Sequence, residues 1–131
     1  MKSLEHLVAP ASEYYIYSPS KVAQSMFLYP LRCGVFTYEP GYRLARRAFN
    51  SFPPLDIHKG TIQLETSGQA QTVQAGHFIL LDCYQPHAYA TDAGYTCLWL
   101  HFDGIQARSY YQLITSRLGP VWDMEDVSPA L

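Results

Sequence analysis

Hydrophobic and polar positions alternate in short stretches between about residue 27 and residue 104. A period of two residues indicates a β-strand with one buried face, because successive side chains point to opposite sides of a strand. Turn signals such as Pro40-Gly41 and Ser67-Gly68 interrupt the alternation at short intervals. Several short strands separated in this way predict an antiparallel β-sandwich or β-barrel.

The pattern also predicts where the individual strands lie and how deeply they are buried. HFILLD at residues 77–82 is almost continuously apolar, which predicts a strand buried on both faces, whereas residues 69–75 have only Val73 pointing inward. RLARRAF at residues 43–49 has a composition that fits a helix, but the flanking turn and NSFPP favour a strand with exposed arginines. The β pattern begins at about Phe27, and six or seven short strands are predicted within residues 31–39, 43–49, 55–59, 61–66, 69–76, 77–82, a segment from 87, and 95–104, with a break at Lys59-Gly60 and the last strand the longest.

The strand YTCLWLHFDG at residues 95–104 carries a mixed aromatic and polar face. Alternation places two groups on opposite faces: Tyr95, Cys97, Trp99 and His101 on one, and Thr96, Leu98, Leu100 and Phe102 on the other. The second group is expected to pack against another layer. On the segment before this strand, His87 and Tyr89 also share a face. Aromatic rings with polar edges around one concavity suit a small polar ligand such as a sugar. A core tryptophan and a hydrogen-bonded turn histidine would give the same pattern.

The pattern changes outside this region. Residues 1–26 predict an arm with little regular structure, with one helical turn at most near Ser18-Pro19. After residue 104 the apolar spacing becomes helical, and Gly119-Pro120 supplies a stop. The apolar positions of this helix are Ile105, Tyr110, Leu113, Ile114 and Leu118. We expect Tyr110, Leu113 and Ile114 to pack partly on the barrel and partly on a partner. Ser128-Pro129 predicts the start of another helix, which indicates a piece cut from a longer protein.

Composition narrows the function classes. The formal net charge is −2, and Arg43, Arg46 and Arg47 form the main basic cluster, so this fragment is not expected to bind nucleic acid. The three cysteines form no CxxC pair, which predicts free thiols in a reducing compartment. The N-terminus lacks the apolar segment of a signal peptide, and no apolar run reaches membrane-spanning length. We therefore expect a cytoplasmic protein that does not enter a membrane.

Three segments in order resemble the N-terminal effector-binding domain of AraC-type transcription regulators. They are the turn at His58-Lys59-Gly60, residues 76–89 (GHFILLDCYQPHAY) and residues 95–104, followed by a helix, and the resemblance covers about residues 27–118. It implies a mostly β, cupin-like antiparallel β-barrel or jelly roll followed by a C-terminal helix. The chain then divides into an N-terminal arm (1–26), a cupin-like effector-binding barrel (27–104), and a helix with the start of a truncated dimerisation region (105–131).

The resemblance also implies a function. It implies a small-molecule effector in the barrel, often a sugar, and an N-terminal arm that can close over it. It implies a homodimer formed through C-terminal helices. DNA would be bound in the full-length protein by a separate domain with two helix-turn-helix motifs, which this chain lacks.

Site residues follow from the resemblance where the strands align. It implies that the effector contacts His87, Tyr89, Cys97 and Trp99, together with an arginine from an early strand. That arginine is expected to be Arg46, although a shift of a few residues would make it Arg43 or Arg47. Two features depart from the family: Cys97 stands where the pocket can have histidine, and the turn DCYQPH lacks the usual PPG. An arabinose-like effector is therefore less strongly implied than a small polar molecule in general.

Two other functions compete with a sensor. A metal-dependent cupin enzyme, an isomerase or a dioxygenase, would need several converging ligands, typically an HxH pair, a glutamate and a third histidine. No two of the five histidines form HxH, and YRLARRAFNSFPP offers arginines where the first ligands would fall. We therefore expect no metal, no cofactor and no enzymatic activity. The second alternative function is a dimerisation module without a ligand, which the predicted helix after residue 104 would by itself suggest.

Overall fold

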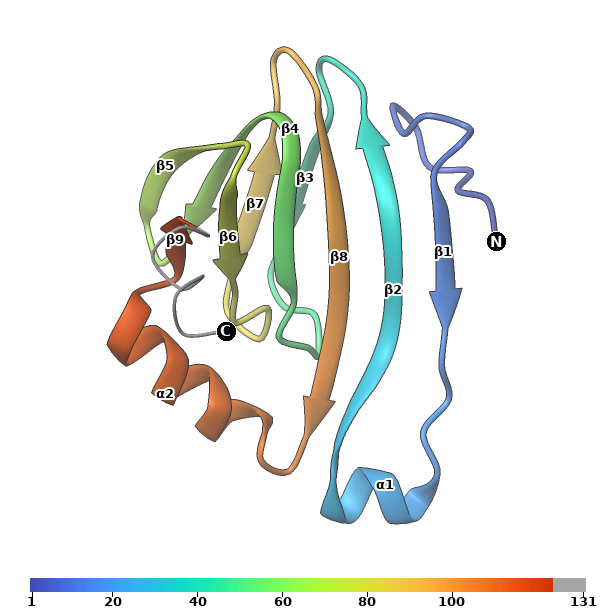
Figure 1. The fold of residues 1–131 in the computed structure, drawn as a ribbon, viewed down its shortest axis with the longest axis vertical. Coiled ribbons are helices and arrows are strands. Elements are labelled where there is room, and N and C mark those ends of the chain that lie inside the picture. The colour runs from blue at the N-terminus through green and yellow to red at the C-terminus, as the bar shows by residue number, and fades with distance from the viewer. Residues whose placement is uncertain (124–131) are drawn as a thin grey trace.

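The computed structural model describes residues 1–123, so the predicted helix start at Ser128-Pro129 lies outside the described residues. Within that range the chain forms an antiparallel β-structure with two helices (Figure 1). In chain order the elements are β1 (Glu13–Ile16), α1 (Lys21–Met26), β2 (Leu28–Tyr38), β3 (Arg43–Arg46), β4 (Pro54–Thr66), β5 (Gln69–Gln74), β6 (His77–Leu80), β7 (His87–Ala90), β8 (Tyr95–Gly104), α2 (Ala107–Leu118) and β9 (Val121–Asp123). Neither helix is long and apolar enough to cross a membrane.

The strands form two layers that share β4. One layer has the order β1-β2-β8-β4-β6-β9, and the other joins β5, β4, β7 and β3. The first half of β4 pairs with β6 and β8, and its second half pairs with β5 and β7. All of these pairings are antiparallel, which confirms the fold class that the sequence predicts.

The predicted break at Lys59-Gly60 is a bulge within one strand. The register of β4 against β8 shifts between Ile57 and Lys59, and the strand continues past it. Gly60 has φ 79° and lies so close to Gly94 that a Cβ would sit 2.2 Å from the carbonyl oxygen of Gly94. A bulge of this kind bends a strand, which lets β4 pass from one layer to the other. Because β4 is continuous over 13 residues, it is longer than the 10-residue β8, which was predicted to be the longest.

The core lies between the two layers. Val73 is the only buried position of β5, as the alternation predicts, and Ile79 and Leu80 of β6 are both buried. Each large aliphatic side chain that is fully buried contributes roughly 1.5–3 kcal/mol to stability. The aliphatic part of the core includes Leu55, Ile57, Ile62, Leu64, Val73, Ile79 and Leu81. Aromatic rings fill the other part, where Phe36 meets Trp99 edge-on with centroids 5.1 Å apart.

The N-terminal 26 residues are more regular than predicted. β1 pairs with β2 at the edge of its layer (Figure 1), and Ser20 caps α1 by accepting a hydrogen bond from the backbone of Ala23. The prediction of an arm with little regular structure is therefore wrong for β1, whereas the helical turn predicted near Ser18-Pro19 is present as the short helix α1. The ordered sheet thus begins before residue 27, and β9 extends it beyond residue 104.

The predicted C-terminal helix is present as α2, which starts two residues later than the apolar pattern. Gly119 ends it with φ 73° and donates its backbone N–H to Thr115. The helix places Ala107 and Tyr111 against the barrel, and the Tyr111 ring lies 5.4 Å from that of Phe52. Of the residues expected to pack partly on the barrel, Tyr110 and Leu113 are instead exposed, and only Ile114 is half-buried.

Candidate functional site

A cavity of about 340 Å³ opens between the two layers. Its walls come from the N-terminal segment and from strands β2, β3, β4, β7 and β8. Volumes of this size are typical of sites that hold small molecules. The cavity is therefore the first candidate for a binding site.

The aromatic and polar face of β8 forms one wall. Tyr95, Cys97, Trp99 and His101 all line the cavity, as the alternation predicts. The opposite face does not pack as expected, because Leu98 is 44% exposed. Only toward the end of β8 does that face meet another layer, where Phe102 stacks on Phe52 with centroids 5.9 Å apart.

Trp99 owes its position to a glycine on the neighbouring strand. Gly34 of β2 faces Trp99 in the register, and a Cβ at Gly34 would lie 2.6 Å from the indole ring. Any larger residue would push the indole toward the cavity. The indole Nε1 is buried and has no hydrogen-bond partner among the described residues. An unpaired buried donor costs roughly 1–3 kcal/mol, so a ligand acceptor at this point would be favourable.

The arginine of the early strand is Arg46. On β3, Leu44 and Arg46 point to the cavity, and the guanidinium carbon of Arg46 lies 4.6 Å from the centroid of the Phe49 ring. Arg43 is exposed and pairs with Asp92 at 3.3 Å, and Arg47 is exposed and does not line the cavity. Of the three candidates, the structure brings Arg46 alone to the cavity.

A second cavity arginine was missed by sequence reasoning. Arg32 of β2 lines the cavity, and its guanidinium carbon lies 4.9 Å from the centroid of the same Phe49 ring. Its Nε is buried without a hydrogen-bond partner among residues 1–123. The alternation in LRCGVFTY could have predicted that Arg32 faces inward, because it places Arg32 on the same strand face as the buried Phe36.

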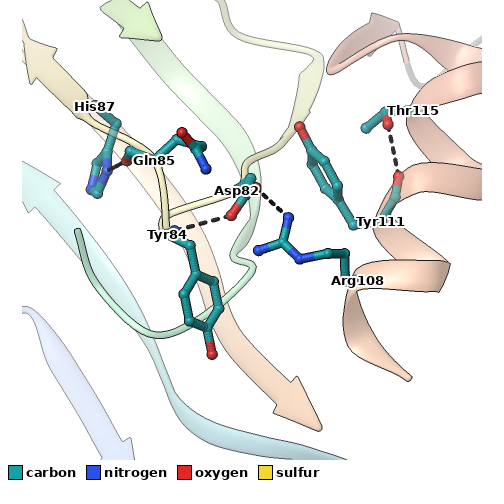
Figure 2. Close-up of polar contacts among 7 residues, drawn as sticks. All are labelled: Asp82, Tyr84, Gln85, His87, Arg108, Tyr111 and Thr115. Atoms are coloured by element: carbon teal, nitrogen blue, oxygen red, sulfur yellow. Dashed lines mark hydrogen bonds and ion pairs between the residues drawn. The ribbon is translucent and has the colours of Figure 1, made fainter. Parts of the chain in front are cut away.

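His87 lies elsewhere than predicted. Its side chain is buried but does not line the cavity, and Nδ1 lies 2.9 Å from the carbonyl oxygen of Gln85 (Figure 2). Its ring packs against that of Tyr89, which does line the cavity, with centroids 5.5 Å apart. His87 therefore matches the alternative interpretation, a hydrogen-bonded turn histidine. Its Nε2 atom is buried and has no hydrogen-bond partner among the described residues.

Burial favours the neutral forms of Cys97, Tyr89 and His101 in the cavity wall. It raises the pKa of the Cys97 thiol and of the Tyr89 hydroxyl well above their ordinary values. A thiol with a raised pKa is mostly protonated at neutral pH and is therefore a weak nucleophile. Burial, with smaller contributions from Arg32 and Arg46, lowers the pKa of His101 to about 3.

His101 is held by a hydroxyl rather than by a carboxylate. The Ser51 Oγ lies 2.6 Å from Nδ1 of His101, which leaves Nε2 as the ring nitrogen available to a ligand. A serine and a histidine without an orienting acid lack the third member of a hydrolytic triad. Among residues 1–123, no group of three or more His, Cys, Asp or Glu side chains is placed to hold a metal ion.

The N-terminal segment forms the rim of the cavity. Ser3, Leu4 and Glu5 are part of its lining, and Glu5 accepts a hydrogen bond of 2.6 Å from the Tyr42 hydroxyl. The N-terminal ammonium group donates to the carbonyl of Tyr14 at 2.9 Å. These contacts hold the first residues of the chain across the opening.

Asp82 connects the turn before β7 to α2 (Figure 2). One carboxylate oxygen accepts a hydrogen bond from the backbone N–H of Tyr84 at 3.0 Å, so Asp82 caps the turn. The other accepts from Arg108 at 2.7 Å. Because β7 carries Tyr89, this pair joins a cavity wall to the helix.

Comparison with known proteins assigns the fold and the family. Residues 30–130 match the family described as AraC-like ligand binding domain. A search of curated proteins found no match.

Solved structures share the architecture at low identity. A cupin 2 conserved barrel domain protein from Leptotrichia buccalis has a TM-score of 0.62 at 9% identity, covering 97% of this chain and 48% of that one. The plu4264 protein from Photorhabdus luminescens has a TM-score of 0.58 at 9% identity, covering 88% and 91%. The Cupin_2 domain of an XRE family transcriptional regulator from Enterobacter cloacae has a TM-score of 0.51 at 13% identity, covering 70% and 95%. These likenesses show the cupin fold, and the family match covers most of the chain. The chain therefore belongs to the family of AraC-like ligand-binding domains.

Proposed function

We propose that this chain is the effector-sensing domain of a cytoplasmic AraC-type transcription regulator and binds a small polar molecule between its two layers. The observation that carries the proposal is the cavity of about 340 Å³ lined by Trp99, whose buried indole N–H has no hydrogen-bond partner among the described residues. A sugar is the effector class implied by the resemblance. An aromatic plate with hydrogen-bonding edges suits a hydroxylated ring.

Each proposed contact has a distinct task. Trp99 offers a ring face and a donor, Tyr89 offers a hydroxyl, and Arg46 offers a fork of donors. Cys97 contributes a neutral surface beside Trp99. His87 is better assigned to supporting the Tyr89 ring than to touching the effector, given its place behind that ring.

The rest of the chain fits the same function. We propose that residues 1–26 close the cavity, since Glu5 already meets Tyr42 at the rim. Dimerisation through α2 would use the exposed side chains Tyr110 and Leu113. DNA contacts would belong to a separate domain of the regulator. No step of this function requires a metal or a cofactor.

The proposal is tested by thermal-shift screening of monosaccharides and other small polar metabolites against the chain and a tryptophan variant. Trp99→Phe removes the indole N–H while keeping an aromatic ring, so binding of any hit should weaken by roughly tenfold, as expected for one lost hydrogen bond of about 1.4 kcal/mol. Trp122→Phe is the matched control, because Trp122 stacks on Phe78 and does not line the cavity. Equal effects of the two substitutions would count against binding at this site.

A further inference from the structure

The charges of the cavity wall do not balance. Two arginines, Arg32 and Arg46, line the cavity, and Glu5 is the one acidic side chain among its described lining residues. Glu5 is engaged with the Tyr42 hydroxyl. No ion pair among residues 1–123 involves Arg32 or Arg46. The wall therefore carries more positive than negative charge.

Contacts within the protein satisfy these arginines only in part. Both guanidinium groups lie over the Phe49 ring, at 4.9 Å for Arg32 and 4.6 Å for Arg46. A cation over an aromatic face gains about 0.5–2 kcal/mol, but the ring carries no charge to cancel its own. The buried Nε of Arg32 still has no acceptor. Both side chains are half-buried, and a positive charge with reduced access to water is stabilised by a partner of opposite charge, which an anion in the cavity would supply.

His101 does not add to this positive charge. Its burial and the nearby arginines keep the imidazole neutral at pH 7, and Ser51 occupies its Nδ1. The unpaired N–H of Trp99 lies on the same wall. The cavity thus combines a cationic end with a neutral aromatic wall that can hold a ring.

We infer that the effector is a ring-bearing carboxylate whose carboxylate group binds Arg32 and Arg46. This inference rests on the proposed function and narrows it from a neutral sugar to an acid. The planar fork of arginine matches a carboxylate with two parallel hydrogen bonds, which a hydroxyl cannot offer. The ring bearing the carboxylate is that of a sugar acid or of an aromatic acid, since Trp99 and the tyrosines of the wall accommodate both.

The experiment compares acids with their neutral counterparts. Glucuronate against glucose, galacturonate against galactose, and benzoate against benzyl alcohol are titrated into the chain by calorimetry at constant ionic strength. The acid of at least one pair is expected to bind at least tenfold more tightly than its neutral partner, and that pair identifies the kind of ring. Raising the salt concentration should weaken this binding, because the contact is ionic.

Variants then test the arginines. Arg46→Gln and Arg32→Gln should each weaken binding of the acid at least tenfold, and Arg46→Lys should restore part of it by keeping the charge. Arg43→Gln, on the same strand but exposed and paired with Asp92, should leave binding unchanged. Circular dichroism of each variant shows whether the barrel is intact. If one of the glutamine variants unfolds, the Arg46→Lys variant and the salt titration still decide the question.

The outcomes separate this inference from the function on which it rests. If neutral compounds bind as tightly as the acids and the arginine variants have no effect, the inference of a carboxylate is wrong. The proposal that the chain binds an effector would then still stand. If none of the six compounds binds, the ring-bearing carboxylate is overturned, and the thermal-shift screen then decides separately whether effector binding itself stands.

Discussion

At the residue scale, His101 in the cavity wall has a pKa well below its ordinary value because of its surroundings. The imidazole is held by Ser51 at 2.6 Å and lies near the positive charges of Arg32 and Arg46. Burial and these charges disfavour the protonated ring, so the pKa falls to about 3. In the unfolded chain the same ring would titrate near its ordinary value of about 6.5.

This difference predicts how stability depends on pH. Between about pH 6.5 and pH 3 the unfolded chain binds a proton that folded His101 does not. Stability from this residue is therefore fully present above that range and is lost as the pH falls, by up to about 1.4 kcal/mol per pH unit. His101→Gln should flatten the pH dependence of the free energy of unfolding, measured by urea denaturation between pH 7 and pH 4.5.

The exposed His6 supplies the control for this measurement. His6→Gln should leave the slope of stability against pH as it is in the unmodified chain. The same slope in the His101 variant and in the unmodified chain would show that the imidazole is not kept neutral by its surroundings.

Single residues of the site were predictable to the extent that strand alternation determines them. Cys97 and Trp99 were placed correctly because β8 is regular over its length. His87 shares a face with Tyr89, yet only Tyr89 reaches the cavity, because the histidine ring packs behind it and binds Gln85. Alternation gives the face of a strand but not the depth of a side chain. Arg32 was missed because an inward arginine is recognised only when a cavity is known to lie there.

At the scale of elements, local patterns were reliable and long-range pairings were not. The Ser67-Gly68 turn and the alternation of β5 are local, and both were predicted. β1 was missed because the four residues EYYI become a strand only by pairing with β2, which lies later in the chain. In α2 the buried side includes the small Ala107, whereas the apolar Tyr110 and Leu113 face outward. Hydrophobicity alone therefore did not identify the side of the helix that packs on the barrel.

The connection between α2 and the turn before β7 supports a prediction at this scale. The Asp82 side chain is only 10% exposed, so its pair with Arg108 is less screened by water than a surface pair. We expect a coupling free energy of about 1 kcal/mol between the two residues in a double-mutant cycle. Asp82→Asn, Arg108→Gln and the double variant are compared by urea unfolding. Asparagine keeps an oxygen for the backbone N–H of Tyr84, so the cycle isolates the pair.

Arg117, in the last turn of α2, supplies a matched control. It is exposed, and the described residues offer it no ion-pair partner. Arg117→Gln combined with Asp82→Asn should give additive effects. Additivity of the Asp82 and Arg108 substitutions as well would mean that the pair does not fasten the helix to the turn.

At the scale of the whole molecule, both helices expose apolar side chains. On α2, Tyr110 and Leu113 are spaced three residues apart, on one helix face, and are 46% and 54% exposed. On α1, Val22 and Met26 are four residues apart and are each 60% exposed. Because dimerisation through C-terminal helices is expected for this family, we predict that the exposed face of α2 forms the dimer interface. The two helices thus provide a direct comparison.

We predict that charges on α2 abolish self-association and that charges on α1 do not. The chain should show a concentration-dependent average mass in sedimentation equilibrium, because an apolar helix face gains from burial against a second copy. Tyr110→Asp with Leu113→Asp should keep the protein monomeric, since burying carboxylates in an apolar contact is costly. Val22→Asp with Met26→Asp carries the same added charge on α1 and should associate like the unmodified chain. If only the α1 variant is monomeric, the interface lies on the N-terminal side of the barrel. If the unmodified chain is monomeric at every concentration, the prediction of a dimer formed by α2 is wrong.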